Sequence, residues 1–106
     1  MAVFDRDEQG AAELIVRDFD LPELLHVSMD EVRSFLKNRI SNLMNQNMGL
    51  LMSILYRIDV SEVRLKMILE FSHHADIPGE IADLVIERQL EKIRIRQQYA
   101  RAQRER

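Results

Sequence analysis

The chain has 106 residues, the size of one domain, and it contains no cysteine, which excludes disulfides, thiolate metal sites and cysteine nucleophiles. Its net charge of −3 is unevenly spread: residues 1–87 hold 8 basic and 16 acidic side chains, a charge of −8, whereas residues 88–106 hold 7 basic and 2 acidic ones, a charge of +5. Only three Gly and two Pro are available for hairpin turns, and good helix formers dominate, so the composition predicts an all-α protein.

No targeting or membrane segment is expected in this sequence. The N-terminal stretch MAVFDRDEQG has no apolar run of the kind that secretory signals carry. The longest apolar stretch, Met48 to Tyr56, is roughly half of the ~20 residues that a membrane span needs. We therefore expect a cytoplasmic protein without a membrane partner.

Residues 1–27 are predicted to form a loosely ordered N-terminal arm. The first ten residues resemble an unstructured terminus, and AAELIVRDF at residues 11–19 could form a short helix of two turns. Asp20 and Pro22 then interrupt the pattern. We place the boundary of the helical-bundle domain at residue 28, so that the bundle comprises residues 28–106.

Two helices are expected in the first half of the bundle. Ser28 and Glu31 have the spacing of a capping box, and apolar residues follow at helical intervals, which predicts a helix at about 29–45. Asn47 is a good N-cap for a second, shorter helix at 48–57. Because this helix is apolar almost all round, we expect it to be a central, buried element.

The stretch YRIDVSE, residues 56–62, is predicted to be a joint between two helices. Either Asp59 or Ser61 can cap the helix that follows. Tyr56, Ile58 and Val60 are expected to anchor the corner in the core. The next helix carries an apolar pattern that fades around His73-His74.

The last helix, capped by Asp76 and running from about 78 to 103, shows two apolar stripes. The stripe expected to face the core contains Ile77, Ile81, Leu84, Val85, Ile95 and Tyr99. A second stripe, Ile86, Leu90 and Ile93, lies on another face, and we predict that it is the interface of a homo-oligomer, with a dimer favoured. The alternative is that the N-terminal arm covers this stripe within one chain. The expected architecture is a small bundle of about four helices with a long C-terminal helix.

At YRIDVSE and again at IADLVIERQLEKIRIRQ, residues 81–97, the chain resembles a family of short all-helical bacterial proteins. They share an LYRIDVSE-like joint and a basic terminal helix with an IERQ-type start. The similarity covers roughly residues 48–97. The resemblance implies a compact helical cytosolic protein, and no activity, cofactor or functional residue comes with it.

The sequence contains two Glu-x-x-His pairs, Glu23 with His26 and Glu70 with His73. Two such pairs plus two further Glu hold the metals of ferritin-like di-iron bundles. Here one pair follows a proline and the other falls at a helix end, so a metal-binding bundle is only a third hypothesis. No nucleophile elbow or phosphate-binding loop is present. We therefore expect a protein that is not an enzyme and needs no cofactor.

The basic C-terminal helix leaves two kinds of partner open. Its cations are spread around the helix axis, which suits an acidic protein partner better than a phosphate track. The favoured interpretation is a non-catalytic interaction or assembly protein that self-associates through its C-terminal helix. A nucleic-acid-associated protein that uses the same helix is the alternative.

Overall fold

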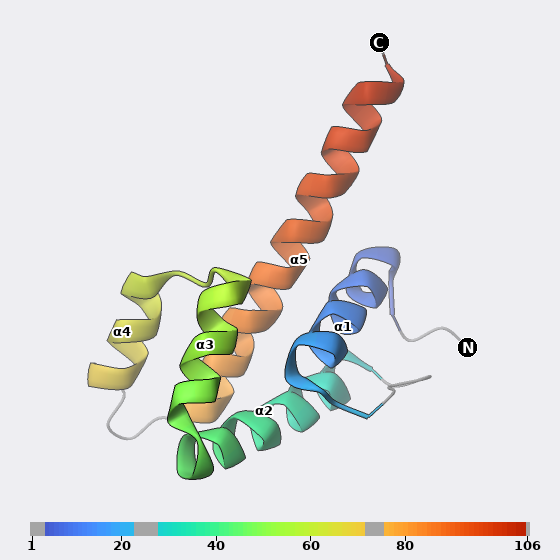
Figure 1. The fold of residues 1–106 in the computed structure, drawn as a ribbon. Helices are drawn as coiled ribbons and strands as arrows, with labels where there is room; N and C mark the ends of the chain where they lie inside the picture. Colours follow the sequence, from blue (N-terminus) through green and yellow to red (C-terminus); the bar gives the residue numbers. More distant parts are fainter. Residues whose placement is uncertain (1–3, 23–27, 72–75, 106) are drawn as a thin grey trace.

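The computed structural model describes residues 4–22, 28–71 and 76–105. Within these ranges the chain is all-helical and contains no strand, which confirms the predicted class (Figure 1). The described residues form five helices rather than about four. They are α1 (Arg6–Phe19), α2 (Met29–Gln46), α3 (Met48–Ile58), α4 (Glu62–Phe71) and α5 (Ile77–Arg104).

The short helix predicted at residues 11–19 is present, but it is longer than expected: α1 begins at Arg6, so the prediction of a loose terminus is wrong for residues 6–10. A capping box starts this helix: the Asp5 carboxylate accepts from the Glu8 amide at 2.8 Å, and the Glu8 carboxylate accepts from the Asp5 amide at 3.0 Å. The apolar side of α1 is buried and shares the core of the other helices. Because this helix packs inside the bundle, residue 28 does not separate a loose arm from a folded domain.

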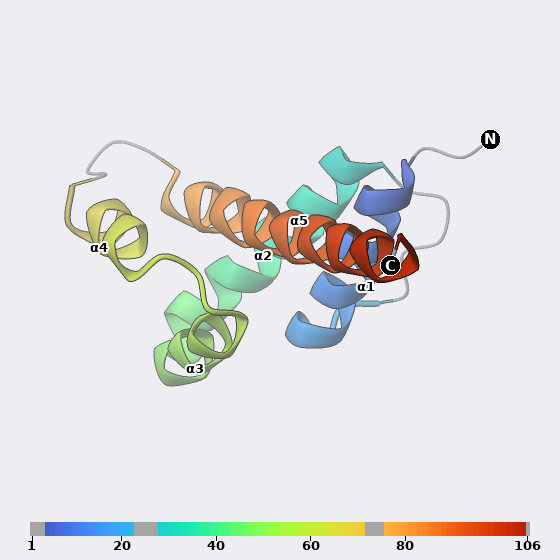
Figure 2. The ribbon, with the colours of Figure 1, turned by 90° about the horizontal axis from the view of Figure 1, so that it is seen from above.

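α5 is the central element of the fold and the only described helix that packs against all four others. Figure 2 shows α2, α3 and α4 around the first half of its axis, whereas α1 lies further along, where Ile93 and Arg94 contact it. The core between them consists of aliphatic side chains and one phenylalanine. Its largest fully buried apolar members are Phe19, Ile15, Leu36, Ile40, Leu51, Leu55, Ile58, Ile81, Val32 and Val85.

The C-terminal half of α5 projects beyond the rest of the bundle (Figure 1). Its 28 residues span about 42 Å at the usual helical rise, and the longest dimension of the molecule is 48 Å. The last buried residue of this helix is Gln89. The predicted core stripe is therefore wrong for Ile95 and Tyr99, whose surfaces are 54% and 68% exposed. The apolar pattern continues along α5 beyond the point where the other helices still pack against it.

The joint predicted at YRIDVSE is present, with each turn residue in a defined role. Asp59 ends α3 in the left-handed conformation, with φ of 67°, and its amide donates to the carbonyls of Leu55 and Tyr56. The Ser61 hydroxyl then accepts from the Arg64 amide at 3.2 Å and caps α4. Ile58 and Val60 are buried as expected. Tyr56, expected to anchor the corner, is instead 73% exposed.

Charged side chains fasten α2 and the start of α5 together. Arg33 donates from Nε and Nη2 to the two carboxylate oxygens of Asp83, at 2.6 and 3.2 Å. Asp76, the N-cap of α5, accepts from the Gly79 amide at 3.1 Å and forms an ion pair with Lys37. The hydrogen bond from Lys37 is the main reason that the pKa of Asp76 lies below its ordinary value.

The Asp76 cap makes a pH-dependent contribution to stability. Because the folded pKa is depressed, this contribution is present above the unfolded pKa of about 4 and is lost as the pH falls through the folded value. Asp76→Asn keeps a capping oxygen but loses the charge. We expect it to lower Tm by about a few degrees at pH 7 and to have no effect near pH 2. Thermal melts of both proteins across this range test the expectation. A difference that persists at pH 2 would contradict it.

Candidate functional site

α4 is the helix most weakly embedded in the fold. Within the described ranges it packs only against α5, whereas α1, α2 and α3 each pack against at least three helices. Leu65 is its one buried side chain. An ion pair between Arg64 Nη2 and Glu87 Oε2, 2.7 Å apart, adds to its attachment on α5. With only one buried side chain, α4 lies on the surface of the bundle rather than in its core.

The outward side of α4 carries an exposed apolar stripe. Val63, Met67 and Phe71 follow one another at intervals of four residues and therefore share a face. Their surfaces are 70%, 54% and 69% exposed. Single exposed apolar residues are ordinary, but a row of three on one helix is a typical mark of an interaction surface. We call these three residues the outer stripe.

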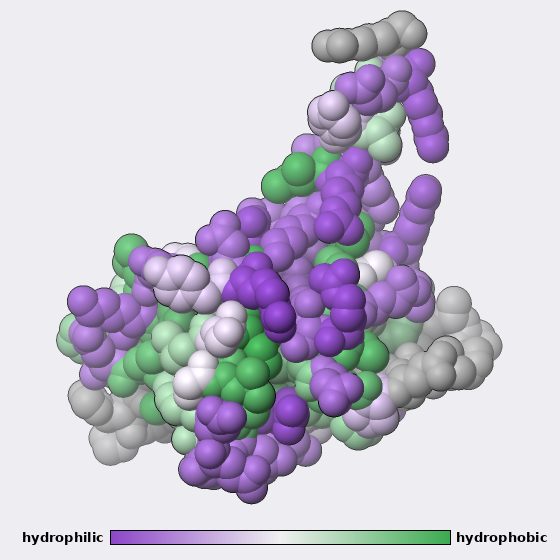
Figure 3. All heavy atoms as spheres, in the orientation of Figure 1, coloured by the Kyte–Doolittle hydropathy of each residue, from purple (hydrophilic) through white to green (hydrophobic). Residues whose placement is uncertain are grey.

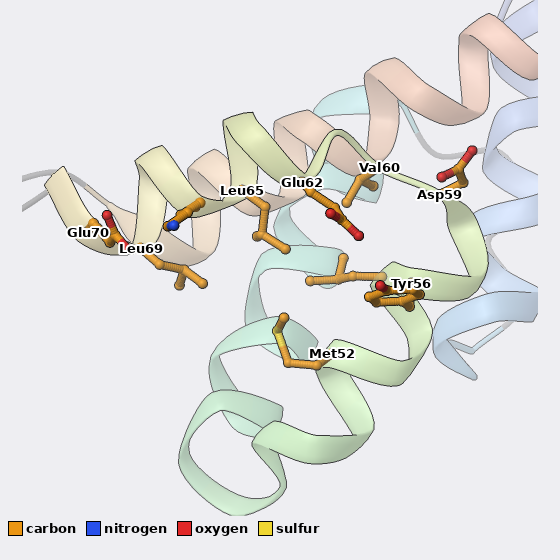
Figure 4. A pocket seen from close by; sticks show the side chains of 10 residues that line it. Met52, Tyr56, Asp59, Val60, Glu62, Leu65, Leu69 and Glu70 are labelled. Carbon is orange, nitrogen blue, oxygen red and sulfur yellow. The ribbon is translucent and has the colours of Figure 1, made fainter.

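A groove of about 400 Å³ lies between α3 and α4, which diverge from the Asp59–Ser61 joint (Figure 4). Met52, Leu55 and Tyr56 line it from α3, and Leu65 and Leu69 line it from α4. Figure 3 shows apolar side chains gathered over this side of the molecule, whereas the projecting end of α5 is mostly hydrophilic. The groove is large enough to take side chains from a second helix.

The edge of the groove is acidic. Asp59, Glu62 and Glu70 stand against one cation, Lys66, which gives the lining a net charge of −2. Tyr56 and Glu62 face each other across the opening, and their hydrogen bond is the main reason that the pKa of Tyr56 is raised. The groove therefore combines apolar walls with a negative edge, which favours an apolar ligand flanked by cations.

Metal ligation has little to build on in the described part of the chain. No group of three or more His, Asp or Glu side chains there is placed so that it could hold one metal ion. Glu70 lies exposed at the edge of the groove. Glu23, His26 and His73 lie outside the described residues, so the Glu-x-x-His hypothesis stays a prediction.

The second stripe of α5 faces α1 over part of its length. Ile86 is half-buried and packs against the core cluster, and Leu90 is also half-buried. Ile93 is half-buried beside Gly10 of α1, where a Cβ on that glycine would lie 3.0 Å from Ile93 Cδ1. An ion pair between Arg94 and Asp7, 3.6 Å apart, joins the same two helices. The predicted interface at Ile86, Leu90 and Ile93 thus loses the open patch on which it depended, and the alternative of coverage by the N-terminal segment is favoured.

Sequence reasoning missed the groove, although a signal for it was present. The runs MGLLMSIL and RLKMILEF are apolar on more than one face. The helix at 48–57 was expected to be a central, buried element, and α3 does bury Leu51, Ile54, Leu55 and Ile58. Among the described residues, no further helix covers the free side of α4. The excess of apolar residues in a ten-residue helix was the sign of an unpartnered face.

Over the part of the chain that the structure describes, fold and site define an all-α domain of five helices with an apolar, acidic-edged groove and a projecting basic helix. Comparisons of the chain with known protein families, with curated proteins and with solved structures gave no match. The resemblance noted at residues 48–97 therefore stays a prediction. None of the described helices is both long and apolar enough to cross a membrane.

Proposed function

We propose that this protein is a non-catalytic interaction or assembly protein whose docking element is α4, comprising the outer stripe and the groove. The observation that supports this most strongly is the apolar exposure of α4 beside an apolar groove. Water-exposed rows of large apolar side chains are unfavourable unless a partner covers them, and each is worth about 1.5–3 kcal/mol when fully buried.

Nucleic-acid association through α5 is the alternative, and the ion pairs of this helix weigh against it. Arg88 pairs with Glu91 and approaches Asp59 at 3.4 Å, and Arg94 approaches Asp7. Within the described ranges, Arg96, Arg101 and Arg104 form no ion pair. Three cations near one helix end can contact about three phosphates, whereas a protein that binds nucleic acid strongly makes about 6–10 phosphate contacts.

Site-specific photo-cross-linking tests the proposed docking element. A benzophenone amino acid is placed at Met67 of the full chain, which is expressed at its natural level and irradiated in the cell. We expect a discrete cross-linked product, because a covered apolar stripe brings a partner within reach of the probe. Val63→Asp in the same chain should reduce that product at least about fivefold, since a charge in the stripe opposes burial.

The matched control carries the probe at Glu13, an exposed position of α1 outside the docking element. It should give only weak products that Val63→Asp does not change. Products of equal yield at Met67 and Glu13, or a Met67 product that survives Val63→Asp, would show that α4 is not a docking element.

A further inference from the structure

We propose that the groove between α3 and α4 receives the C-terminal end of α5 from a second copy of this chain. This inference rests on the proposed docking function of α4 and names its occupant. The relevant segment is residues 95–104, which we call the tail. It has ten residues, as α4 does, so both helices span about 15 Å.

The tail carries a free apolar stripe of the kind that docks into helical grooves. Ile95, Tyr99 and Ala102 recur at intervals of four and three residues and so share one face. That face points away from α1, because the residues that form a hollow with Arg6 of α1 are Gln97, Ala100, Arg101 and Arg104, on the opposite side of the helix. Two large anchors, Ile95 and Tyr99, are thus more than half exposed.

The charges of tail and groove are complementary. The tail contains Arg96, Arg101 and Arg104 and no acidic residue, a charge of +3. At ~100° per residue, Arg96 lies on one side of the apolar stripe and Arg101 on the other, while Arg104 lies on the opposite face of the helix. The groove lining carries a net charge of −2, concentrated at its edge. A helix that carries apolar anchors beside cations complements a groove with apolar walls and a negative edge, and this complementarity identifies the occupant.

The tail cannot reach the groove of its own chain. α5 is one continuous helix, and α4 packs beside its first half, as the Arg64–Glu87 ion pair shows. The tail lies at the far end of the same rigid helix (Figure 1). Occupation of the groove therefore requires a second molecule. Two chains that exchange tails form two equal contacts and close into a dimer, whereas one-way insertion would give open chains.

Two single variants and their mixture test this inference in the purified full-length protein. Tyr99→Asp disables the tail and keeps the groove, while Leu69→Lys disables the groove and keeps the tail. Sedimentation velocity should show the wild type at twice its mass of 12.5 kDa. Each variant alone should dissociate, with a Kd raised roughly tenfold or more. Their equimolar mixture should recover a heterodimer, because one intact tail then meets one intact groove.

Four further measurements make the result specific. Tyr99→Phe retains the apolar anchor and should associate as the wild type does. Glu70→Arg changes an exposed charge at the groove edge, so it keeps the fold even if Leu69→Lys unfolds, and it should also weaken association. Circular dichroism and thermal melts verify the fold of each variant. Raising the salt concentration should weaken the wild-type dimer, because exposed charges attract across this contact.

A monomeric wild type at 1 mM, or folded variants that associate as strongly as the wild type, would overturn the exchange of tails. A mixture that stays monomeric would do so as well. These outcomes differ from failure of the proposed function. If the Met67 cross-link appears in cells with a product heavier than one chain by some mass other than 12.5 kDa, α4 docks a different protein and only the occupant is wrong.

Discussion

Phe19→Ala is expected to lower the free energy of unfolding by about 3–5 kcal/mol, the usual range for removing a fully buried aromatic ring. The Phe19 side chain is 1% exposed and belongs to the core cluster that joins α1 to the other helices. Its carbonyl also accepts from Arg39 Nε of α2 at 3.2 Å, so the end of α1 is fixed by both packing and a hydrogen bond. Urea denaturation monitored by circular dichroism measures the change.

Phe71→Ala is the matched control, because it removes the same ring from an exposed position of α4. Its effect on the free energy of unfolding should stay within about 0.5 kcal/mol. An equally small effect of Phe19→Ala would mean that α1 is not docked in the core. α1 covers part of the second stripe of α5. If Phe19→Ala releases α1 from the core, Ile86 and Ile93 should therefore become exposed and promote aggregation.

Asp18→Ala should destabilise the protein by about 1–3 kcal/mol, because it leaves a buried amide without its partner. Gln89 is 1% exposed, and its Nε2 donates to Asp18 Oδ2 at 2.6 Å across the contact between α5 and α1. The Gln89 Oε1 atom already has no hydrogen-bond partner within the described ranges. Removing the carboxylate would leave the whole amide group unpaired in the interior.

A double-mutant cycle separates this effect from the loss of Asp18 alone. Gln89→Leu replaces the buried amide by an apolar group of similar size, and in that background Asp18→Ala should have a much smaller effect. Denaturation of the wild type, both single variants and the double variant gives the coupling free energy. Additive effects would show that the two side chains do not depend on each other and that their hydrogen bond does not help to hold α1 on α5.

The proposed function requires that some apolar faces are covered within the chain and that others remain exposed for a partner. α1 is held on α5 by Phe19, by the Asp18–Gln89 hydrogen bond and by the close approach of Gly10 to Ile93. That side of α5 is therefore occupied. The apolar stripe of α4 and that of the tail lie at opposite ends of the molecule, so the proposed association between copies would use both at once.

The helix starts and the joint were determined by the sequence alone. Ser28 and Asp76 cap α2 and α5 where their patterns predict it, and Asp59 with Ser61 makes the turn in YRIDVSE. Such features rest on hydrogen bonds between residues three or four positions apart, so a short stretch of sequence contains all the information that they need. The capping box of Asp5 and Glu8 is also a local feature, and the spacing of these two residues in the sequence indicates the start of α1.

Which apolar faces find a partner was decided only by the tertiary structure. Helical periodicity assigned Ile95 and Tyr99 to the core, yet the bundle ends before it reaches them. The same periodicity left Ile93 for an interface between chains, yet α1 of the same chain lies against it. The excess of apolar residues in α4 indicated an unpartnered face, but not that α3 and α4 diverge and leave a groove. A period of 3.6 residues fixes the face on which a side chain lies. It contains nothing about the length of the neighbouring helix or its direction, because those depend on contacts between residues far apart in the chain.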